Sequence, residues 1–245
     1  MARPNPGASV DDILSRQGPP NARTSMGSET LEGLTTEGST PVQAAVVVGD
    51  LRMSSLLLKE AVRPSLFARY LVGFTEAVHG LANDFGGWFD KFTGDGFIAF
   101  WLYRSEDEVI ASVPGFCQAI LPTAESLVMN LKKNSRNFPV GVGLSIGIDS
   151  GPCELVRVGD SVTLLGSPIV GATRMVSGAH AGQALVNVGL GAAFETHRES
   201  LEAIGAQLER RVIATKEYPL GQEAYELEFA TTSKRTREPT PSSAE

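Results

Sequence analysis

Two aspartates stand at points where the chain around them is apolar. Asp50 follows the run VQAAVVVG, and Asp95 lies between two glycines in KFTGDGFIAFW, which runs from Lys91 to Trp101. Two carboxylates held close together repel one another unless a cation lies between them. Oxygen ligands of this kind suit Mg²⁺ and Mn²⁺, the hard divalent ions that serve phosphate chemistry. If the two strands are neighbours, the sequence predicts a metal site at one end of a sheet.

The segment LRMSS, residues 51–55, follows the first aspartate and leads into a predicted helix. Free N–H groups at the start of a helix suit phosphate oxygens. Each aspartate alone also has a simpler explanation. Gly-Asp-Gly is more often only a turn, and Asp50 could simply end a strand or cap a helix.

Hydrophobic spacing predicts the elements that position these residues. Residues 42–50 form a buried strand, and residues 88–93 and 97–102 form a hairpin with Asp95 in its turn. Between them a helix begins near Pro64, which suits a first helical turn. Its apolar side recurs at helical spacing and consists of Phe67, Tyr70, Leu71, Phe74, Val78 and Leu81. Trp88, Phe97 and Trp101 are interpreted as core.

The second half of the chain alternates helices and strands. SEDE at 105–108 has capping-box spacing, and Pro114 and Pro122 predict two helical pieces that end near residue 134. Strands follow at 140–149 and, after a turn, within 150–160. A helix at 167–182, a strand at 183–188 and a hairpin formed by 210–217 and 223–230 complete the chain. This order predicts an α+β fold, mostly an antiparallel sheet with helices on one face.

Composition limits the class of protein. The 245 residues are 42% hydrophobic, and the formal net charge is −7. An acidic balance argues against nucleic acid as a partner. No stretch is long and apolar enough to span a membrane, no signal peptide is evident, and Cys117 and Cys153 have no metal or disulfide spacing, so we expect a cytoplasmic protein without a membrane partner. Residues 1–42 and 230–245 are rich in Pro, Ser and Thr and are expected to be disordered tails around a domain at 43–229.

Five segments, in order, resemble the catalytic domain of class III nucleotide cyclases, the adenylate and guanylate cyclase family. They are VVVGDLRMSS, KFTGDGFIAFW, VGLSIGIDSGPCELVRVGD, LLGSPIVGATRMVSGAHAGQALV and ATKEYPLGQEAYELEF. The resemblance covers roughly residues 43–229 and implies a ferredoxin-like, palm-type fold. It also implies an enzyme in which the ribose 3′-hydroxyl of a nucleoside triphosphate attacks the α-phosphorus and releases pyrophosphate.

The resemblance assigns roles to particular residues. Asp50, Asp95 and the backbone carbonyl of Leu51 would hold two divalent ions, Mn²⁺ or Mg²⁺, with Arg52, Met53 and Ser54 beside the nucleotide. Active sites would lie at the interface of a homodimer.

The partner subunit would supply the remaining groups. Lys91 and Thr163 fall on the base-reading positions. Arg174 falls on the arginine that stabilises charge on the phosphates, and Lys216 falls near the lysine that binds the triphosphate. Taken alone, Arg174 and Lys216 would more simply be exposed surface residues.

Departures from the family bear on the substrate. Val170 stands where the family usually has an asparagine, one helical turn before Arg174. Met53 stands where the family has a glycine, and its larger side chain is expected to narrow the nucleotide pocket. Thr163 can donate or accept a hydrogen bond, whereas the aspartate of many adenylate cyclases only accepts. Donors at Arg52 and Lys91 suit the two carbonyls of uracil. These features favour UTP and cyclic UMP, with ATP or CTP as alternatives.

The solitary domain, with these departures, resembles the pyrimidine cyclases of bacterial Pycsar antiphage systems, which make an alarm signal for a separate effector protein. Val170 and Met53 also fit an inert nucleotide-binding dimerisation module, although a pure binder does not need two metal ligands. A ferredoxin-like RNA-binding sheet is a third possibility. The acidic balance and the lack of a basic aromatic strand face argue against it.

Overall fold

The computed structural model describes residue 31 and residues 39–230. The remaining residues of the two predicted tails, 1–30, 32–38 and 231–245, lie outside the described part. The described elements are β1 (Ser39–Arg52), α3 (Ser54–Glu60), α4 (Pro64–Asp84), β2 (Trp88–Phe92), β3 (Gly96–Leu102), α5 (Glu106–Lys133), β4 (Gly143–Val158), β5 (Ser161–Gly166), α6 (Ser167–Gly178), β6 (Ala184–Asn187), α7 (Val188–Thr196), α8 (Arg198–Ala203), β7 (Ala206–Ile213) and β8 (Gln222–Phe229).

The sheet has the strand order β2-β3-β1-β4-β6-β8-β7, with β5 paired to β4 outside this path. Every pair is antiparallel except β4 and β6. Strand β1 begins at Ser39 rather than at residue 42, because its ladder with β4 extends to the pair Ser39↔Val156. The tail was expected to end at residue 42, so its boundary was four residues too late.

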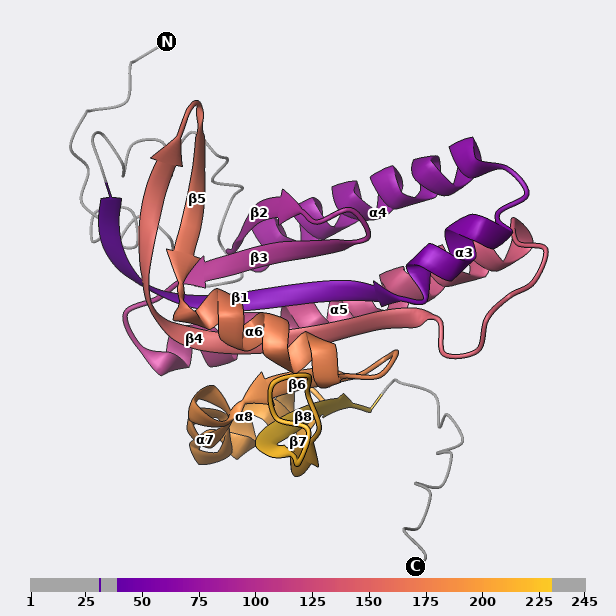
Figure 1. The fold of residues 1–245 in the computed structure, drawn as a ribbon. Coiled ribbons are helices and arrows are strands. Elements are labelled where there is room, and N and C mark those ends of the chain that lie inside the picture. The colour runs from indigo at the N-terminus through magenta and orange to yellow at the C-terminus, as the bar shows by residue number, and fades with distance from the viewer. Residues whose placement is uncertain (1–30, 32–38, 231–245) are drawn as a thin grey trace, which may run out of the picture.

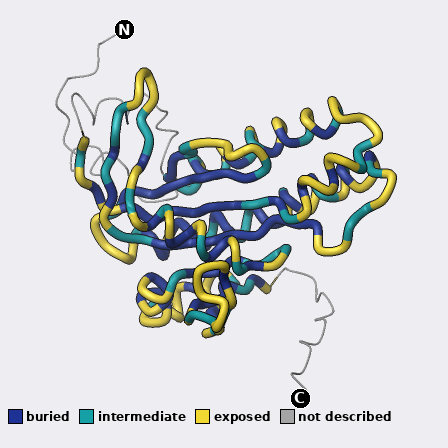
Figure 2. Tube along the Cα trace, viewed as in Figure 1, coloured by how far each residue is buried: buried dark blue, intermediate teal, exposed yellow. Residues whose placement is uncertain are grey.

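Side chains of β1 alternate between two hydrophobic layers. Ala45 and Val47 pack in a large core with α4, α5, α7 and α8, whereas Val46 and Val48 pack in a smaller core that includes Ala172 of α6. Figure 1 shows α4 and α5 on one side of the sheet and α6 on the other. The strands at the centre are dark blue in Figure 2, because both of their faces are covered.

Helix α5 passes through two prolines without ending, so the expectation of two helical pieces was wrong. A proline inside a helix removes one hydrogen bond and costs about 3 kcal/mol. Twelve residues of this helix are buried, Pro114 among them. Burial of this long apolar face offsets both lost bonds, and packing therefore overrides the local signal.

Strand β4 is also longer than the sequence indicated. It runs unbroken through Gly151 and Pro152 to Val158. The turn that reverses the chain into β5 therefore follows Val158, whereas the sequence predicted a turn near residue 150. Helix α6 ends at Gly178, four residues before the expected glycine, and β7 begins at Ala206. The hairpin β2–β3, Pro64 in the first turn of α4, strand β6 and the buried positions of the three aromatic core residues are confirmed.

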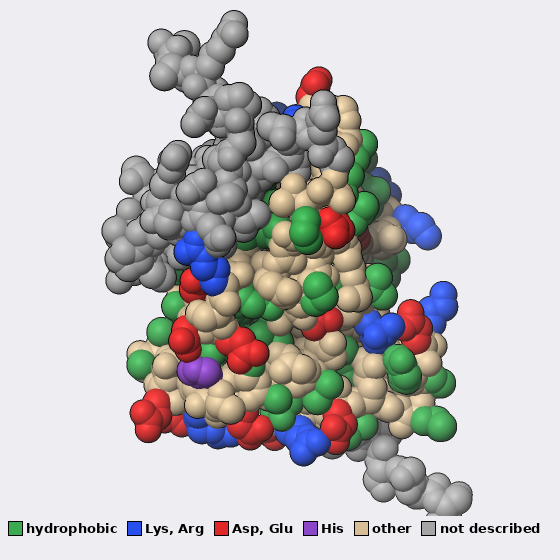
Figure 3. All heavy atoms as spheres, turned by 90° about the vertical axis from the view of Figure 1, so that its left-hand side faces the viewer, with side chains coloured by type: hydrophobic (Ala, Val, Ile, Leu, Met, Phe, Trp, Pro, Cys, Tyr) green, Lys and Arg blue, Asp and Glu red, His purple; other side chains and the backbone are tan. Residues whose placement is uncertain are grey.

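Acidic and basic side chains are interspersed over the face in Figure 3. On the outer hairpin, Arg211 lies between Glu209, Glu226 and Glu228, which are 2.7–3.4 Å from its nitrogens. Within the described residues, no helix is long and apolar enough to cross a membrane.

Candidate active site

The two aspartates meet at one end of the sheet. Asp50 pairs in register with Gly96, the residue that follows Asp95. A Cβ atom at position 96 would lie 2.2 Å from the carbonyl oxygen of Gly49, so only glycine allows the hairpin to approach β1 this closely. The glycine after Asp95 therefore brings the two carboxylates together, which a simple turn would not require.

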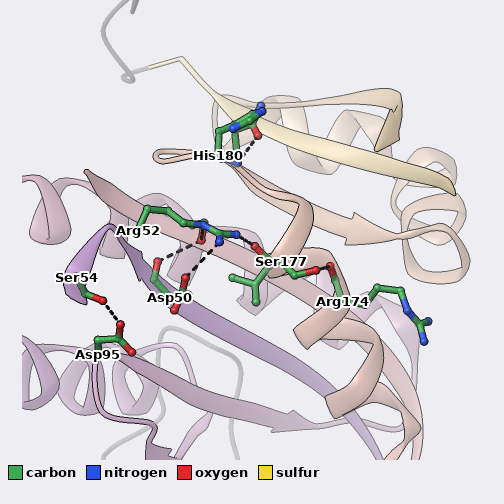
Figure 4. Close-up of polar contacts among 10 residues, drawn as sticks. Asp50, Arg52, Ser54, Asp95, Arg174, Ser177 and His180 are labelled. Atoms are coloured by element: carbon green, nitrogen blue, oxygen red, sulfur yellow. Dashed lines mark hydrogen bonds and ion pairs between the residues drawn. The ribbon is translucent and has the colours of Figure 1, made fainter. Parts of the chain in front are cut away.

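Burial and charge both act on these carboxylates. Desolvation raises the pKa of Asp50; Arg52 opposes this shift, and the charge of Asp95 adds to it. Nη1 of Arg52 lies 3.6 Å from Oδ2 of Asp50, and the Ser54 hydroxyl donates a hydrogen bond to Asp95 (Figure 4). Leu51 is buried and directly follows Asp50, which is the last residue of β1 that pairs with β3.

This donor set fits a divalent ion of the Mg²⁺ type. Among residue 31 and residues 39–230, no group of three or more His, Cys, Asp or Glu side chains could bind a metal. Mg²⁺ characteristically takes only one or two carboxylates and keeps several water ligands. Asp50 and Asp95 supply such a pair, and the Leu51 carbonyl is the adjacent backbone oxygen.

Met53 has a left-handed backbone, with φ 63° and ψ 16°, and it precedes α3. No other non-glycine residue in the described part of the chain has a positive φ. This conformation costs a non-glycine residue roughly 1–2 kcal/mol. The side chain is 45% exposed, so it lies at the surface of the site. Arg52 is bound within the chain, because Nε donates to Ser145 Oγ at 2.9 Å and Nη2 donates to the Val176 carbonyl.

The predicted base-reading residues lie together, and a residue that the sequence analysis missed joins them. Nζ of Lys91 donates to Oγ1 of Thr163 at 2.9 Å, and this hydroxyl lies 2.8 Å from Oδ1 of Asp90. The Asp90 side chain is only 1% exposed, and its Oδ2 lies 3.2 Å from Nζ of Lys91 without a well-directed hydrogen bond. The contact joins β2 to β5.

The predicted phosphate-binding residues lie elsewhere. The guanidinium of Arg174 on α6 points away from Asp50 and Asp95 (Figure 4). Glu217 lies 2.6 Å from its Nε and 2.5 Å from its Nη2, and the ring of Tyr218 lies 5.2 Å away. Lys216 is exposed in the same loop and pairs with none of the described residues. Val170, one turn before Arg174, is 55% exposed.

A second buried carboxylate, that of Asp149 on β4, lies against α6. Asp149 accepts a hydrogen bond from Nδ2 of Asn187 at 2.9 Å and one from the N–H of Ser150 at 2.8 Å. Desolvation raises its pKa, against these two bonds and the charge of Arg174. A Cβ at position 171 would lie 1.7 Å from Oδ2 of Asp149, so Gly171 is needed for α6 to lie this close.

Within one chain, the predicted metal ligands lie together and the predicted base-reading residues lie together, but the predicted phosphate-binding arginine is directed away from the metal ligands. Asp50, Asp95 and Ser54 form one cluster, Lys91 and Thr163 form another, and the guanidinium of Arg174 points away from both aspartates. Asp90 was missed because regular strand alternation would direct it away from Lys91. Glu217 was missed, although it directly follows Lys216 and carries the opposite charge.

Comparison with known proteins identifies the fold. No protein-family model and no curated protein matches the sequence. Among solved structures, the adenylyl cyclase CyaB from P. aeruginosa aligns with a TM-score of 0.64 and 18% identity, over 80% of this chain and 98% of that one. The guanylyl cyclase Cya2 aligns with a TM-score of 0.60 and 15% identity, over 81% and 98%.

The guanylate cyclase domain of RhGC from Catenaria anguillulae, solved in complex with GTP, aligns with a TM-score of 0.58 and 14% identity, over 78% of this chain and 98% of that domain. At these identities the comparisons establish architecture. The chain has the α+β fold of the adenylyl and guanylyl cyclase catalytic domains.

Proposed function

We propose that this protein is a nucleotide cyclase that converts a nucleoside triphosphate to its 3′,5′-cyclic monophosphate and pyrophosphate. The pairing of Asp50 with Gly96 carries the proposal, because it places two carboxylates side by side at one end of a cyclase-type sheet. A purely structural hairpin would not require this approach. The GTP bound to the structurally similar RhGC domain supports a triphosphate as the ligand.

In the proposed reaction, a bond forms between the 3′-oxygen and the α-phosphorus, and the bond from the α-phosphorus to the bridging oxygen of the β-phosphate breaks. The 3′-hydroxyl loses its proton, and pyrophosphate leaves. Asp50, Asp95 and the Leu51 carbonyl would hold two divalent ions. When bound, such ions lower the pKa of the attacking hydroxyl and neutralise charge on the leaving group.

The chain's own residues orient the substrate. Lys91 and Thr163 hold the base, and the cations Arg174 and Lys216 attract the phosphate oxygens, which carry the increasing charge. Ser54 orients the carboxylate of Asp95 through its hydroxyl.

The direction of Arg174 supports a homodimer. Its guanidinium points away from the two carboxylates of its own chain. We therefore assign Arg174 of a complete site to a second copy, which by the resemblance also supplies Lys216 and the base-reading pair Lys91 and Thr163. Mixing Asp95→Ala and Arg174→Ala chains should therefore restore activity, because one of the two sites in the mixed dimer is intact. An active monomer, or no recovery in a verified mixed dimer, would contradict shared sites.

We propose UTP as the substrate. The contacts of Arg52 and Thr163 in the structure alter the reasons for this choice. Arg52 binds Ser145 and Val176, and it is therefore no longer a donor for the base. Thr163 directs its proton at Asp90 and so offers a ligand only an acceptor. Uracil still fits, with O4 facing Lys91 and N3–H facing Thr163, and Met53 restricts the space for a second ring. Because an acceptor at Thr163 also suits the amine of adenine, ATP is the second candidate.

The role in a pathway rests on the resemblance to pyrimidine cyclases. We propose that cyclic UMP acts as a signal in antiphage defence and is read by a separate effector protein in the cytoplasm.

Incubation with UTP, CTP, ATP and GTP in the presence of Mn²⁺, with products identified by mass spectrometry, tests the function. We expect cyclic UMP to form fastest, and Asp50→Ala and Asp95→Ala to abolish it in folded protein. Cyclic AMP as the main product would replace the substrate and keep the reaction. Tight binding of a triphosphate without any cyclic product would support the inert binding module.

A further inference from the structure

A β-bulge builds the base-reading cluster. The pairing of β2 with β3 runs Phe89↔Ala99 and then Lys91↔Ile98, so Asp90 is an extra residue in β2. In a regular strand, successive side chains point to opposite faces. The bulge changes this direction, so Asp90 and Lys91 both reach Thr163 on β5.

The hydrogen bonds of this cluster fix the position of one proton. An ammonium group only donates and an ionised carboxylate only accepts, so Thr163 accepts from Lys91 and donates its single proton to Asp90. The lone pair that remains on Oγ1 can only accept from a ligand. The Asp90 side chain is 1% exposed and does not meet the base itself.

We propose that Asp90 is a positioning residue that sets base specificity through Thr163. By holding the hydroxyl proton, Asp90 makes Thr163 an obligate acceptor, so the base must present an N–H at this point. Thr163 then acts on the base as an aspartate would, although it carries no charge. This inference rests on the proposed function for the base-reading role of Lys91 and Thr163.

Asp90→Asn should reverse the polarity of the site. The amide oxygen of the new side chain faces Lys91, because the ammonium needs an acceptor, and its NH₂ group therefore donates to Thr163. The hydroxyl proton is then free to turn toward the ligand. A base with an acceptor at this point gains, and a base with an N–H loses.

Two pairs of triphosphates measure this effect, because the members of each pair differ in hydrogen-bonding pattern and hardly in size. UTP is compared with CTP, and ATP with ITP. In the pair that the enzyme uses, we expect Asp90→Asn to shift the ratio of kcat/KM by about five- to a hundred-fold toward the member that the wild type disfavours, which is the effect of one unpaired group. Asp160→Asn, at the exposed turn between β4 and β5, removes the same charge and should leave the ratio unchanged.

A double-mutant cycle separates this role from a structural one. On a Thr163→Val background, Asp90→Asn should no longer change the ratio, because the hydroxyl through which it acts is gone. An unchanged ratio in folded Asp90→Asn, an equal loss for both members of a pair, the same shift without Thr163, or a wild type that does not discriminate within either pair would overturn the inference. If the wild type cyclises no triphosphate, the proposed function fails. The same ratios are then measured as equilibrium affinities, and an unchanged affinity ratio in Asp90→Asn overturns the inference separately.

Discussion

Replacing Glu217 by glutamine removes the negative charge that faces Arg174 and keeps the shape of the side chain. The carboxylate competes with a triphosphate for the same guanidinium, because one oxygen lies within 2.6 Å of both Nε and Nη2. We expect Glu217→Gln to lower the KM for the triphosphate and to leave kcat unchanged. The variant would release Arg174 before the substrate arrives.

The exposure of the pair sets the size of the effect. The side chains of Arg174 and Glu217 are 26% and 57% exposed, and ion pairs exposed to this degree contribute about 0.2–1 kcal/mol. At about 1.4 kcal/mol per factor of ten, KM should fall by about 1.4- to five-fold. The difference should shrink as salt is added, because salt screens exposed charges.

Steady-state kinetics at two ionic strengths measures this change. Glu223→Gln is the matched control, because Glu223 is about as exposed as Glu217 and forms a 2.7 Å pair with Arg210 on the outer hairpin. A KM that is unchanged or higher, or a kcat that falls ten-fold or more, would refute the competition. Glu217 would then be needed to hold Arg174 in its working orientation.

Gly171→Ala should destabilise the fold by about 1–3 kcal/mol in urea denaturation, because the new Cβ would lie 1.7 Å from Oδ2 of Asp149; unchanged stability would show that α6 can move away freely. The Ala193 carbonyl and, after it, Asp107 raise the pKa of His197, despite some desolvation, so an NMR titration should give a midpoint above the ordinary value, and Asp107→Asn should lower it. Because the pKa is raised in the folded state, the stabilising contribution of His197 is complete below its ordinary pKa and disappears as pH rises through the raised one. His197→Gln should therefore reduce stability at pH 5 and have little effect at pH 9.

The sequence identifies Asp50 and Asp95 as a candidate pair from local signals, which are the glycines on both sides of Asp95 and the apolar strand before Asp50. That the two strands are neighbours was a condition of this prediction, and the structure meets it through the pairing of β1 with β3. Lys91 and Thr163, 72 residues apart, were placed by resemblance alone, and the structure brings them to 2.9 Å.

Non-local packing decides the features that the sequence did not predict. Pro114 and Pro122 end a helix on local grounds, but the apolar face of α5 packs along its whole length. Asp90 joins Lys91 only because of a bulge, which the alternation of WFDKF does not signal. Pairing with β1 on one side keeps β4 continuous through Gly151 and Pro152.

Strand β5 forms a ladder with β4 alone and contacts β2 through Thr163, and this arrangement has a consequence for how such a protein can diverge. Leu164 is buried in the smaller core, whereas Thr163 beside it is half-buried and hydrogen-bonds to Lys91 and Asp90, so position 163 is constrained by these partners rather than by core packing. Asp90 is constrained by the same bond. Without the Thr163 hydroxyl, its buried carboxylate loses its directed hydrogen bond, at a cost of about 1–3 kcal/mol or more. Positions 90 and 163 should therefore covary among homologues, and a lineage that changes its nucleobase should change both.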